Sequence, residues 1–517
     1  MGTDTTYARP TARPAPNGER GGLLAPAADQ THTPYLTALL GHVASGPLRL
    51  TVPGHKGGAS APDALRAALG ADALALDVPA ITEGIDVGEA PTALERAREL
   101  AAQAVGAQRT WFCLNGASQG NHAVCLALAL AGHRDVVVQR SAHGSTIDGL
   151  VLSGLRPSWV LPEIDPELGV PHTVTPAALA AALRAAPQAR AALVLSPSYH
   201  GAVADVRGLA AVAHAHGAEL IVDEAWGAHL AFATVFPAHA LACGADVVIS
   251  STHKHLGSLT GTAMLHLGPR ASLPAADVER AFALVGTTSP NALALASLDA
   301  TRQRAACDGE QLATRTLHGI AALCERLRSL PGVEIGGDRF RGREGVHALD
   351  PLRVVIDVRA TGLDGRMIAR ALREQHDIHV ELSDRTLVLV LIGLGEEVEP
   401  LAERLVAGLA EILATATITS VPTARVAPAP SLAAPRLTPR EAALAPAVTV
   451  PLDAAVGRVA AQSLSIYPPG IPQVLPGEPV TAALVAQLRA AARLGCTIRG
   501  LDDDRVRVLA TGPGGCA

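Results

Sequence analysis

The chain has 517 residues, enough for two or three domains, with only 2% aromatic and 17% charged residues. Its formal net charge of −6 provides no basic surface for nucleic acid, and no polybasic segment indicates a membrane surface. The longest apolar run, near residues 123–131, is too short to cross a bilayer, and no export signal opens the chain. Seven cysteines without CxxC spacing indicate reduced thiols in a cytoplasmic protein, and we expect no metal site.

The N-terminal part of the chain is predicted to begin with a disordered leader. Residues 1–30 are rich in proline, alanine, arginine and glycine and show no hydrophobic periodicity. A helix is predicted between Pro34 and Leu50, and the PGHKGG sequence at 53–58 then forces a loop. Helical spacing returns over Pro91–Val105, where the proline suits the first turn and a glycine follows the last.

Between residues 31 and 308, short apolar runs alternate with helical stretches. The predicted strands lie at 135–138, 191–195, 219–222, 246–250 and 262–267, and helices at Thr175–Ala186 and Val206–His216. This alternation is typical of an α/β fold with a mostly parallel sheet covered by helices. Ligands of such sheets bind at the carboxyl ends of the strands, so polar residues that follow these runs are expected to share one cleft.

Two further units are predicted after this large domain. A smaller α/β domain over residues 309–415 is indicated by strands at Leu352–Val358, Ile378–Glu381 and Thr386–Leu391 and helices at Gly365–Gln375 and Glu399–Ala414. Residues 416–437 are rich in proline, alanine, serine and threonine and are predicted to be a linker. Residues 438–517 then form a separate C-terminal unit.

The chain is organised around the segment from Asp246 to Gly268. A β-branched run breaks into Ser-Thr-His-Lys and a glycine-containing loop, so Lys254 is expected just past the end of a buried strand. A lysine in this position is either a solvated surface charge, the usual fate of lysine, or an amine held in a cleft for covalent chemistry. Position alone favours the first alternative, and the polar segments upstream favour the second.

Three upstream segments place polar groups at the ends of apolar runs. The NGASQGN sequence precedes an apolar helix, so the N–H groups of Gly116, Ala117 and Ser118 could bind an anion; the alternative is an ordinary turn with a serine cap. Asp223 ends a strand and either caps the next helix or pairs with a buried cation. His143 is either a satisfied loop histidine or a ring that lies flat against a planar cofactor.

Together these four features describe a pocket for pyridoxal phosphate. Its phosphate needs a helix N-terminus, its pyridine nitrogen a carboxylate, its ring a stacking partner and its aldehyde a lysine. Independent coincidence of all four, in this order and in this strand context, is much less common than any one of them. The sequence therefore predicts a cofactor site with Lys254 and Asp223 at its centre.

The same segments resemble the Orn/Lys/Arg decarboxylase family in its short form, among the fold-type I pyridoxal phosphate enzymes. The resemblance rests on PGHKGG (53–58), the run that ends in NGASQGN (106–121), RSAHGSTIDGLVLSG (140–154), SPSYHG (196–201), VDEAWGAH (222–229), SSTHKHLGSLTGTAML (250–265), TTSPNALALASLD (287–299), VPLDAAVGR (450–458) and YPPGIPQVLPGE (467–478). It implies an aspartate aminotransferase-like large domain, a smaller α/β domain and a separate C-terminal α+β domain. Two segments depart from the family pattern, HGS in place of the more usual HKS and SPSYHG in place of SPTYYG, and these departures concern the substrate more than the cofactor.

The resemblance also assigns roles to individual residues. Lys254 would bond the cofactor covalently, Asp223 would bond the pyridine nitrogen, and His143 would stack on the ring. Trp226 would contact the ring hydroxyl, and His253, beside the lysine, would relay protons. The phosphate would be held by Gly116, Ala117, Ser118 and Ser251, and from the neighbouring subunit by Thr287, Thr288 and Ser289.

The implied reaction is decarboxylation of arginine, lysine or ornithine to agmatine, cadaverine or putrescine. Protonation at Cα, by Lys254 or His253 as general acid, would yield the amine. A carboxylate should receive the distal cation of the substrate, and the candidates are Glu83, Asp86 and Glu478. The three amino acids stay open, because a methylene difference is worth only about 1–3 kcal/mol in a pocket.

Two other functions are alternatives to this reaction. An aminotransferase or lyase on the same scaffold would be recognised by a keto-acid product. A catalytically silent regulatory relative would bind polyamine or pair with an active paralogue, and the intact Lys254, Asp223 and His143 argue against it.

The protein is predicted to be a homodimer or a small assembly of dimers. The resemblance implies a dimer as the catalytic unit, because residues 287–289 would reach the neighbouring subunit's phosphate. Large members of the family carry an N-terminal wing domain that builds decamers, whereas about thirty unpatterned residues precede the first predicted helix here. We therefore expect no ten-subunit particle.

Overall fold

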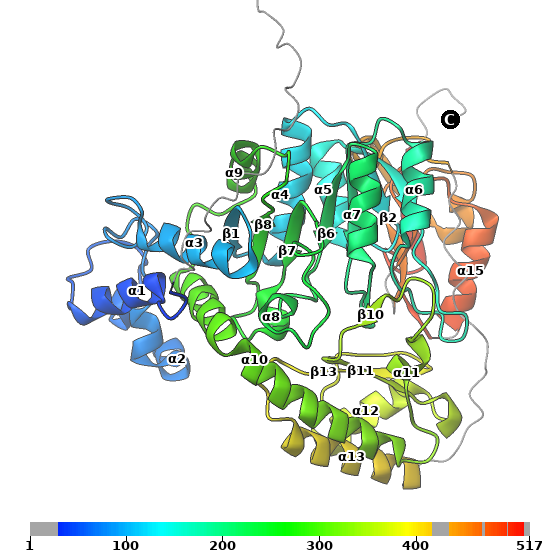
Figure 1. Cartoon of the computed structure of the whole chain (residues 1–517). Helices are drawn as coiled ribbons and strands as arrows, with labels where there is room; N and C mark the ends of the chain where they lie inside the picture. The colour runs from blue at the N-terminus through cyan, green and yellow to red at the C-terminus, as the bar shows by residue number, and fades with distance from the viewer. Residues whose placement is uncertain (1–28, 416–433, 468–470, 494, 511–517) are drawn as a thin grey trace, which may run out of the picture.

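The computed structural model describes residues 29–415, 434–467, 471–493 and 495–510 (Figure 1). Most of the predicted leader at 1–30 and of the predicted linker at 416–437 lies outside the described residues. Among the helices that the structure describes, none is both long enough and apolar enough to cross a membrane.

A seven-stranded sheet forms the centre of the large domain. Its strands are β1 (Arg109–Cys113), β2 (Asp135–Gln139), β3 (Arg156–Val160), β4 (Ala191–Leu195), β6 (Glu219–Asp223), β7 (Val247–Ser250) and β8 (Ala263–Leu267). The order is β1-β8-β7-β6-β4-β2-β3, and β8 runs antiparallel to both of its neighbours while the other pairs are parallel. The predicted mostly parallel sheet is therefore confirmed, and every predicted strand of this domain is present.

Helices cover both faces of this sheet because its strands are apolar on both sides. The helices between residues 93 and 284 are α3 (Ala93–Val105), α4 (Gly116–Leu130), α5 (Gly144–Ser153), α6 (Pro176–Ala185), α7 (Val206–Ala215), α8 (Thr252–His255) and α9 (Ala275–Leu284), and a short helical turn, η2 (Leu230–Phe232), lies among them. Along β2, Val136 and Val138 pack with α4, α5 and α9, whereas Val137 packs with α6 and α7. The alternation of side chains along each strand thus builds two cores, one on each face.

The smaller domain is an antiparallel sheet packed on helices. Its elements are β9 (Glu334–Ile335), α11 (Gly336–Phe340), β11 (Arg353–Asp357), η3 (Arg359–Thr361), α12 (Gly365–His376), β12 (Leu382–Ser383), β13 (Leu387–Leu391) and α13 (Val398–Thr415), in sheet order β12-β13-β11-β9. The 37-residue helix α10 (Ala292–Arg328) joins the two domains and runs through the predicted boundary at 308 and 309. A two-stranded ladder of β5 (Ala202–Val203) and β10 (Ala348–Leu349) also joins them.

One predicted strand of this domain is wrong. Residues 378–381 are not a strand; β12 begins at Leu382. The helix before it ends at His376, and the capping residue Asp377 is left-handed with φ +51, so the next residues turn the chain back toward the sheet.

The described C-terminal part is a separate unit that lies against the large domain (Figure 1). Its elements are α14 (Pro439–Leu444), β14 (Ala447–Pro451), η4 (Leu452–Ala455), β15 (Leu464–Tyr467), β16 (Pro472–Val474), α15 (Ala482–Arg493), β17 (Thr497–Arg499) and β18 (Arg505–Leu509). They form a two-stranded and a three-stranded antiparallel sheet around one apolar cluster. At the other end of the molecule, α1 (Pro34–Ala44), η1 (Lys56–Gly58) and α2 (Asp63–Ala75) form a projecting N-terminal lobe (Figure 1).

Candidate active site

Lys254 lies immediately after β7, where the parallel strands of the sheet end. The strand stops at Ser250, Ser251 is extended as the cap, and the short α8 carries the lysine. Burial disfavours the ammonium ion and lowers the pKa of Lys254 to about 8, although Asp223 opposes this effect; Arg353 reinforces it. Lys254 is half-buried, so it is not a solvated surface charge.

Asp223 ends β6, the strand beside β7. It pairs in register with Ile249, one residue before β7 ends. Its Oδ1 accepts the N–H of Ala225 at 3.1 Å, and its Oδ2 accepts Nδ2 of Asn121 at 3.0 Å. Because this carboxylate raises the pKa of Lys254, the two groups lie within electrostatic reach of each other.

The first turns of α4 lie against the ends of these strands. The helix approaches so closely that a Cβ at Gly120 would lie 2.8 Å from Cγ2 of Ile249. Gly116, at φ +63, donates its N–H to the Gly261 carbonyl at 2.6 Å. The N–H groups of Ala117 and Ser118 come next and have no acceptor within the helix, so they can bind an anion.

His143 caps α5 from the loop after β2. Its Nδ1 accepts the backbone N–H of Ser145 at 3.2 Å and lies 2.8 Å from the Ser145 hydroxyl oxygen. The imidazole is otherwise exposed, so one face is free for a planar ligand.

Trp226 lies between two cations. The Lys254 Nζ is 3.6 Å from the centroid of its ring, and the Arg353 Cζ is 3.7 Å from it. Arg353 comes from β11 of the smaller domain and is 5% exposed. One of its nitrogens donates to the Tyr199 carbonyl, while Nε and Nη2 have no hydrogen-bond partner among the described residues, and burial lowers the pKa of the guanidinium to about 10.

Arg353 and Glu381 were missed by the sequence analysis. Glu381 accepts the Tyr199 hydroxyl at 2.8 Å, is itself exposed, and raises the pKa of both Lys254 and Arg353. Tyr199 lies within the SPSYHG segment, edge-on to Trp226 at 5.2 Å. Arg353 and Glu381 lie about a hundred residues or more after Lys254, the first in β11 and the second just before β12, and their spacing from the lysine carries no chemical signal.

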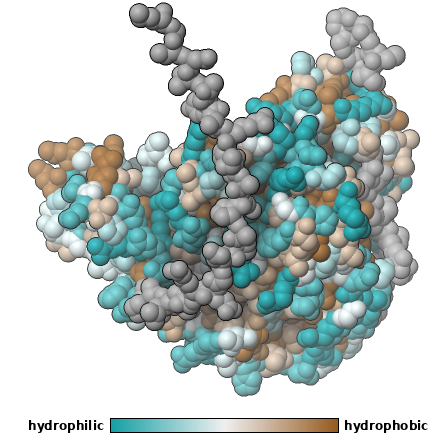
Figure 2. All heavy atoms as spheres, turned by 45° about the horizontal axis from the view of Figure 1, so that its top comes forward, coloured by the Kyte–Doolittle hydropathy of each residue, from teal (hydrophilic) through white to brown (hydrophobic). Residues whose placement is uncertain are grey.

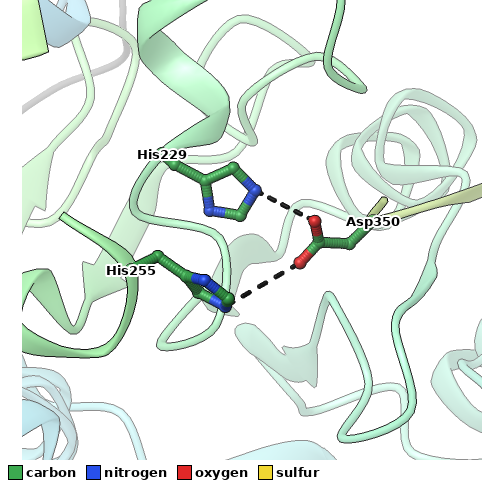
Figure 3. Close-up of side chains that lie close together, drawn as sticks. All are labelled: His229, His255 and Asp350. Carbon is green, nitrogen blue, oxygen red and sulfur yellow. Dashed lines mark hydrogen bonds and ion pairs between the residues drawn. The ribbon is translucent and has the colours of Figure 1, made fainter. Parts of the chain in front are cut away.

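His229, His255 and Asp350 form a buried cluster (Figure 3). The Nε2 of His229 donates to one carboxylate oxygen at 3.0 Å, and the Nε2 of His255 lies 4.0 Å from the other. The Nδ1 of His255 lies 3.2 Å from the Ile392 carbonyl. These groups offer ligand atoms to a cation. However, Arg353 already brings a positive charge close to Asp350. We therefore interpret the cluster as a contact between the large domain, which carries the two histidines, and the smaller domain, which carries Asp350.

The other predicted residues are distributed as follows. His253 directs its Nδ1 at the Thr262 carbonyl, 2.7 Å away. Ser251 is 1% exposed beside the lysine, and Thr287, Thr288 and Ser289 are exposed between α9 and α10. Their roles toward a cofactor stay predictions.

The three predicted ligands of the substrate cation are not gathered at Lys254. Glu83 is exposed in the N-terminal segment, and Asp86 lies near Tyr35 and Arg98, with burial raising its pKa to about 6. Glu478 is 2% exposed, and Arg140 holds both of its oxygens at 2.5 and 2.8 Å. The prediction for Glu478 is not supported, because its charge is already neutralised by a buried guanidinium.

The donors and acceptors around Lys254 fit pyridoxal phosphate. The unpaired N–H groups at the start of α4 suit a phosphate, Asp223 suits a protonated ring nitrogen, and the buried amine of Lys254 suits an aldehyde. His143 supplies a ring face for the cofactor.

Comparisons with known proteins agree with this geometry. Residues 33–335 match the family model described as Orn/Lys/Arg decarboxylase, major domain, and residues 423–505 match its C-terminal domain. The chain is 34% identical to the arginine decarboxylase of Bacillus subtilis over 485 residues, covering 93% of this chain and 98% of that protein. It is 33% identical to the arginine decarboxylase of Halalkalibacterium halodurans over 485 residues, covering 93% and 97%.

A solved structure shows the same fold. Lysine decarboxylase A from Pseudomonas aeruginosa superposes with a TM-score of 0.76 at 21% identity, covering 92% of this chain and 80% of that chain.

Proposed function

Because the chain belongs to the Orn/Lys/Arg decarboxylase family of pyridoxal phosphate-dependent enzymes, we propose that it decarboxylates arginine to agmatine and CO₂. The observation that carries the proposal is the pair of Lys254 and Asp223 at the ends of adjacent strands, with the amine pKa lowered to about 8. The names of the two relatives favour arginine over lysine and ornithine.

The residues around the lysine would hold the cofactor as follows. Lys254 bonds the aldehyde carbon, and its lowered pKa leaves more of the amine neutral, and therefore nucleophilic, at neutral pH. Ala117 and Ser118 donate backbone N–H groups to the phosphate, with Gly116 shaping the turn and the Ser251 hydroxyl beside them. Thr287, Thr288 and Ser289 reach the phosphate from a second subunit.

When bound, pyridoxal phosphate supplies an electron sink for the electron pair that the departing CO₂ leaves behind. Asp223 would hold a proton on the ring nitrogen, which would keep that sink positively charged. His143 would cover one face of the ring, and Trp226 would contact its hydroxyl.

We infer that His253 relays the proton that Cα receives. Its Nδ1 lies 2.7 Å from a carbonyl oxygen, which can only accept, so Nδ1 carries a proton, and His253 would donate to Cα a second proton taken up at Nε2. Lys254, one residue further on, is the other candidate for this general acid.

We further propose Glu381 as the carboxylate that receives the distal guanidinium of arginine. It is exposed, is oriented by the Tyr199 hydroxyl at 2.8 Å, and lies close enough to Lys254 to raise its pKa. A guanidinium and a carboxylate can form two parallel hydrogen bonds, which suits arginine. Glu83 and Asp86 stay predictions for the same role.

The catalytic unit that we propose is a homodimer or a small assembly of dimers. Hydrophobic side chains gather on the projecting N-terminal lobe (Figure 2). The most exposed of them are Leu48 at 85%, Leu50 at 83%, Ile81 at 68% and Val52 at 66%. A second copy of the chain would remove this surface from water. Six unpaired cysteines among the described residues suit the cytoplasm, where we place the enzyme.

The test is an end-point assay of cofactor-loaded protein with arginine, lysine and ornithine side by side, with the product identified by mass. We expect agmatine as the main product, and none from Lys254→Ala. A keto acid would identify an aminotransferase, whereas bound cofactor without any product would favour a regulatory relative. Light scattering that gave a ten-subunit particle would contradict the proposed assembly.

A further inference from the structure

His143 and Asp223 are joined by an unbroken chain of hydrogen bonds through two buried residues. Asn121 is 4% exposed, and its Nδ2 lies 3.0 Å from both the Asp223 carboxylate and the Ser145 hydroxyl oxygen. Ser145 is also 4% exposed, and its hydroxyl lies 2.8 Å from Nδ1 of His143. The four residues come from α4, α5, its cap and the end of β6.

The direction of every bond in this chain is determined. The Asp223 carboxylate only accepts, so the amide nitrogen of Asn121 must face it. The second proton of that nitrogen then goes to the Ser145 oxygen. The Ser145 oxygen has one proton and a second lone pair, so the direction of its contact with Nδ1 of His143 is decided by whether that ring nitrogen carries a proton.

A backbone N–H group decides the protonation of Nδ1 in His143. The N–H of Ser145 also points at Nδ1, at 3.2 Å, and it can only donate. Nδ1 must therefore accept with its bare lone pair, and the Ser145 hydroxyl donates its proton to the same nitrogen. The ring nitrogen that carries the proton is therefore Nε2, which takes no part in these hydrogen bonds.

We propose that Asn121 and Ser145 are positioning residues of the cofactor site, which join His143 to Asp223 and fix His143 as the Nε2–H tautomer. The inference rests on the proposed function, because positioning residues need a bound cofactor to position. Asn121 and the Ala225 N–H hold one oxygen each of Asp223, so the plane of the carboxylate is set from both sides. His143 then presents a neutral ring face and a single Nε2–H donor to the cleft.

The first test reads the tautomer without cofactor. Full-length cofactor-free protein with ¹⁵N-labelled histidine is studied by NMR, and His143→Gln identifies the signals of this ring. We expect a protonated Nε2 and a bare Nδ1. A protonated Nδ1 overturns the inference, whether or not the protein binds a cofactor.

The second test follows the chain to its far end with ¹⁵N-labelled pyridoxal phosphate. The fraction of bound cofactor with a protonated ring nitrogen reports on Asp223, which Ser145 does not touch. We expect Asn121→Ala to weaken this protonation about tenfold and Ser145→Ala about threefold, since each removes one or two hydrogen bonds. Ser145→Ala should add nothing in an Asn121→Ala background, because the link is already broken.

Two matched variants separate positioning from packing. Ser145→Thr keeps the hydroxyl and should restore the wild-type value. Ser153→Ala removes a hydroxyl at the other end of the same helix, where it bonds the Leu150 carbonyl, and should change nothing. Should Asn121→Ala fail to fold, the Ser145 series alone decides.

The outcomes distinguish the two claims. Wild-type protein that binds no pyridoxal phosphate overturns the proposed function, and this inference falls with it. Wild-type protein that binds the cofactor, with Ser145→Ala equal to wild type or Ser145→Thr equal to Ser145→Ala, overturns the inference alone.

Discussion

Arg140 and Glu478 form a buried bidentate ion pair, although 338 positions separate them along the chain. Arg140 follows β2 in the large domain and precedes His143 by three residues, whereas Glu478 belongs to the C-terminal unit. Both side chains are at most 2% exposed, and the guanidinium also lies 5.1 Å from the Trp159 ring centroid. The C-terminal unit is thus anchored directly beside the loop that carries His143.

Breaking this ion pair should destabilise the folded protein. We expect Glu478→Gln to lower the free energy of unfolding by about 3–5 kcal/mol, because it leaves a buried guanidinium without a counter-charge. Urea denaturation measures the loss. The double variant Arg140→Met with Glu478→Leu should recover most of it, since two apolar side chains bury no charge. A single variant as stable as wild type would show that the pair carries no such energy.

The reactivity of Lys254 should follow its lowered pKa. We expect cofactor-free protein to form a borohydride-trapped adduct with pyridoxal phosphate at a rate that is half-maximal near pH 8. Arg353→Met removes a positive charge and should move this midpoint to higher pH. A midpoint near the ordinary value of 10.5 in wild type would contradict the cleft described here.

The same shift predicts how stability depends on pH. The pKa of Lys254 is lower in the folded state than in the unfolded chain, so the unfolded chain binds more protons between about pH 8 and pH 10.5. The stability of cofactor-free protein should therefore rise with pH across this window, relative to Lys254→Met. Parallel stability curves for the two proteins would argue against the shift.

Local sequence was sufficient to predict the large-domain sheet and the place of Lys254. Continuous runs such as VVIS in β7 can only be buried on both faces, and a polar residue directly after such a run must lie at the end of a strand. Neighbouring parallel strands bring those ends together, so Asp223 could be placed beside Lys254. By contrast, β3 contains arginine and proline at the edge of the sheet, and no pattern revealed it.

Residues from other domains could not be predicted in the same way. Arg353 reaches Trp226 only because the smaller domain folds back along α10, and no spacing in the sequence encodes that approach. Glu478 was predicted to bind the substrate because the sequence around an acidic residue does not reveal which cation it pairs with. The structure supplies Arg140, whose role depends on the docking of a unit more than three hundred residues away.

Asp350 should stabilise the contact between the domains. Burial opposes its charge, but His229, His255 and Arg353 together hold the pKa of its carboxyl at about 2. We expect Asp350→Asn to lower the free energy of unfolding at pH 7 by about 3 kcal/mol. Because the folded pKa lies below the unfolded value of 3.8, the difference from wild type should persist at neutral pH and shrink only as the pH falls from about 4 toward 2.

Gly309 allows α10 to pass close to the turn η2. A Cβ at this position would lie 2.3 Å from the backbone oxygen of Phe232, so the helix would have to shift. We expect Gly309→Ala to cost about 1–3 kcal/mol in thermal or urea unfolding. Gly41→Ala is the matched control, because a Cβ in α1 meets nothing within 4 Å and should stabilise the helix by about 0.5–1 kcal/mol. Equal effects of the two changes would exclude the steric explanation.

Glu381 offers the sharpest test of substrate recognition, because we propose it as the ligand of the guanidinium and because it also raises the pKa of Lys254. If its carboxylate receives the guanidinium of arginine, Glu381→Gln should raise KM for arginine about tenfold or more, since a charged pair is replaced by a neutral one. The change also removes a group that raises the pKa of Lys254, so the midpoint of the adduct reaction should move to lower pH. Tyr199→Phe is the matched variant: it keeps the carboxylate and removes only the hydrogen bond that orients it, and should raise KM by a smaller factor. A shifted midpoint with an unchanged KM would keep Glu381 beside the lysine and assign the guanidinium to another carboxylate, with Glu83 and Asp86 of a second subunit as the next to change.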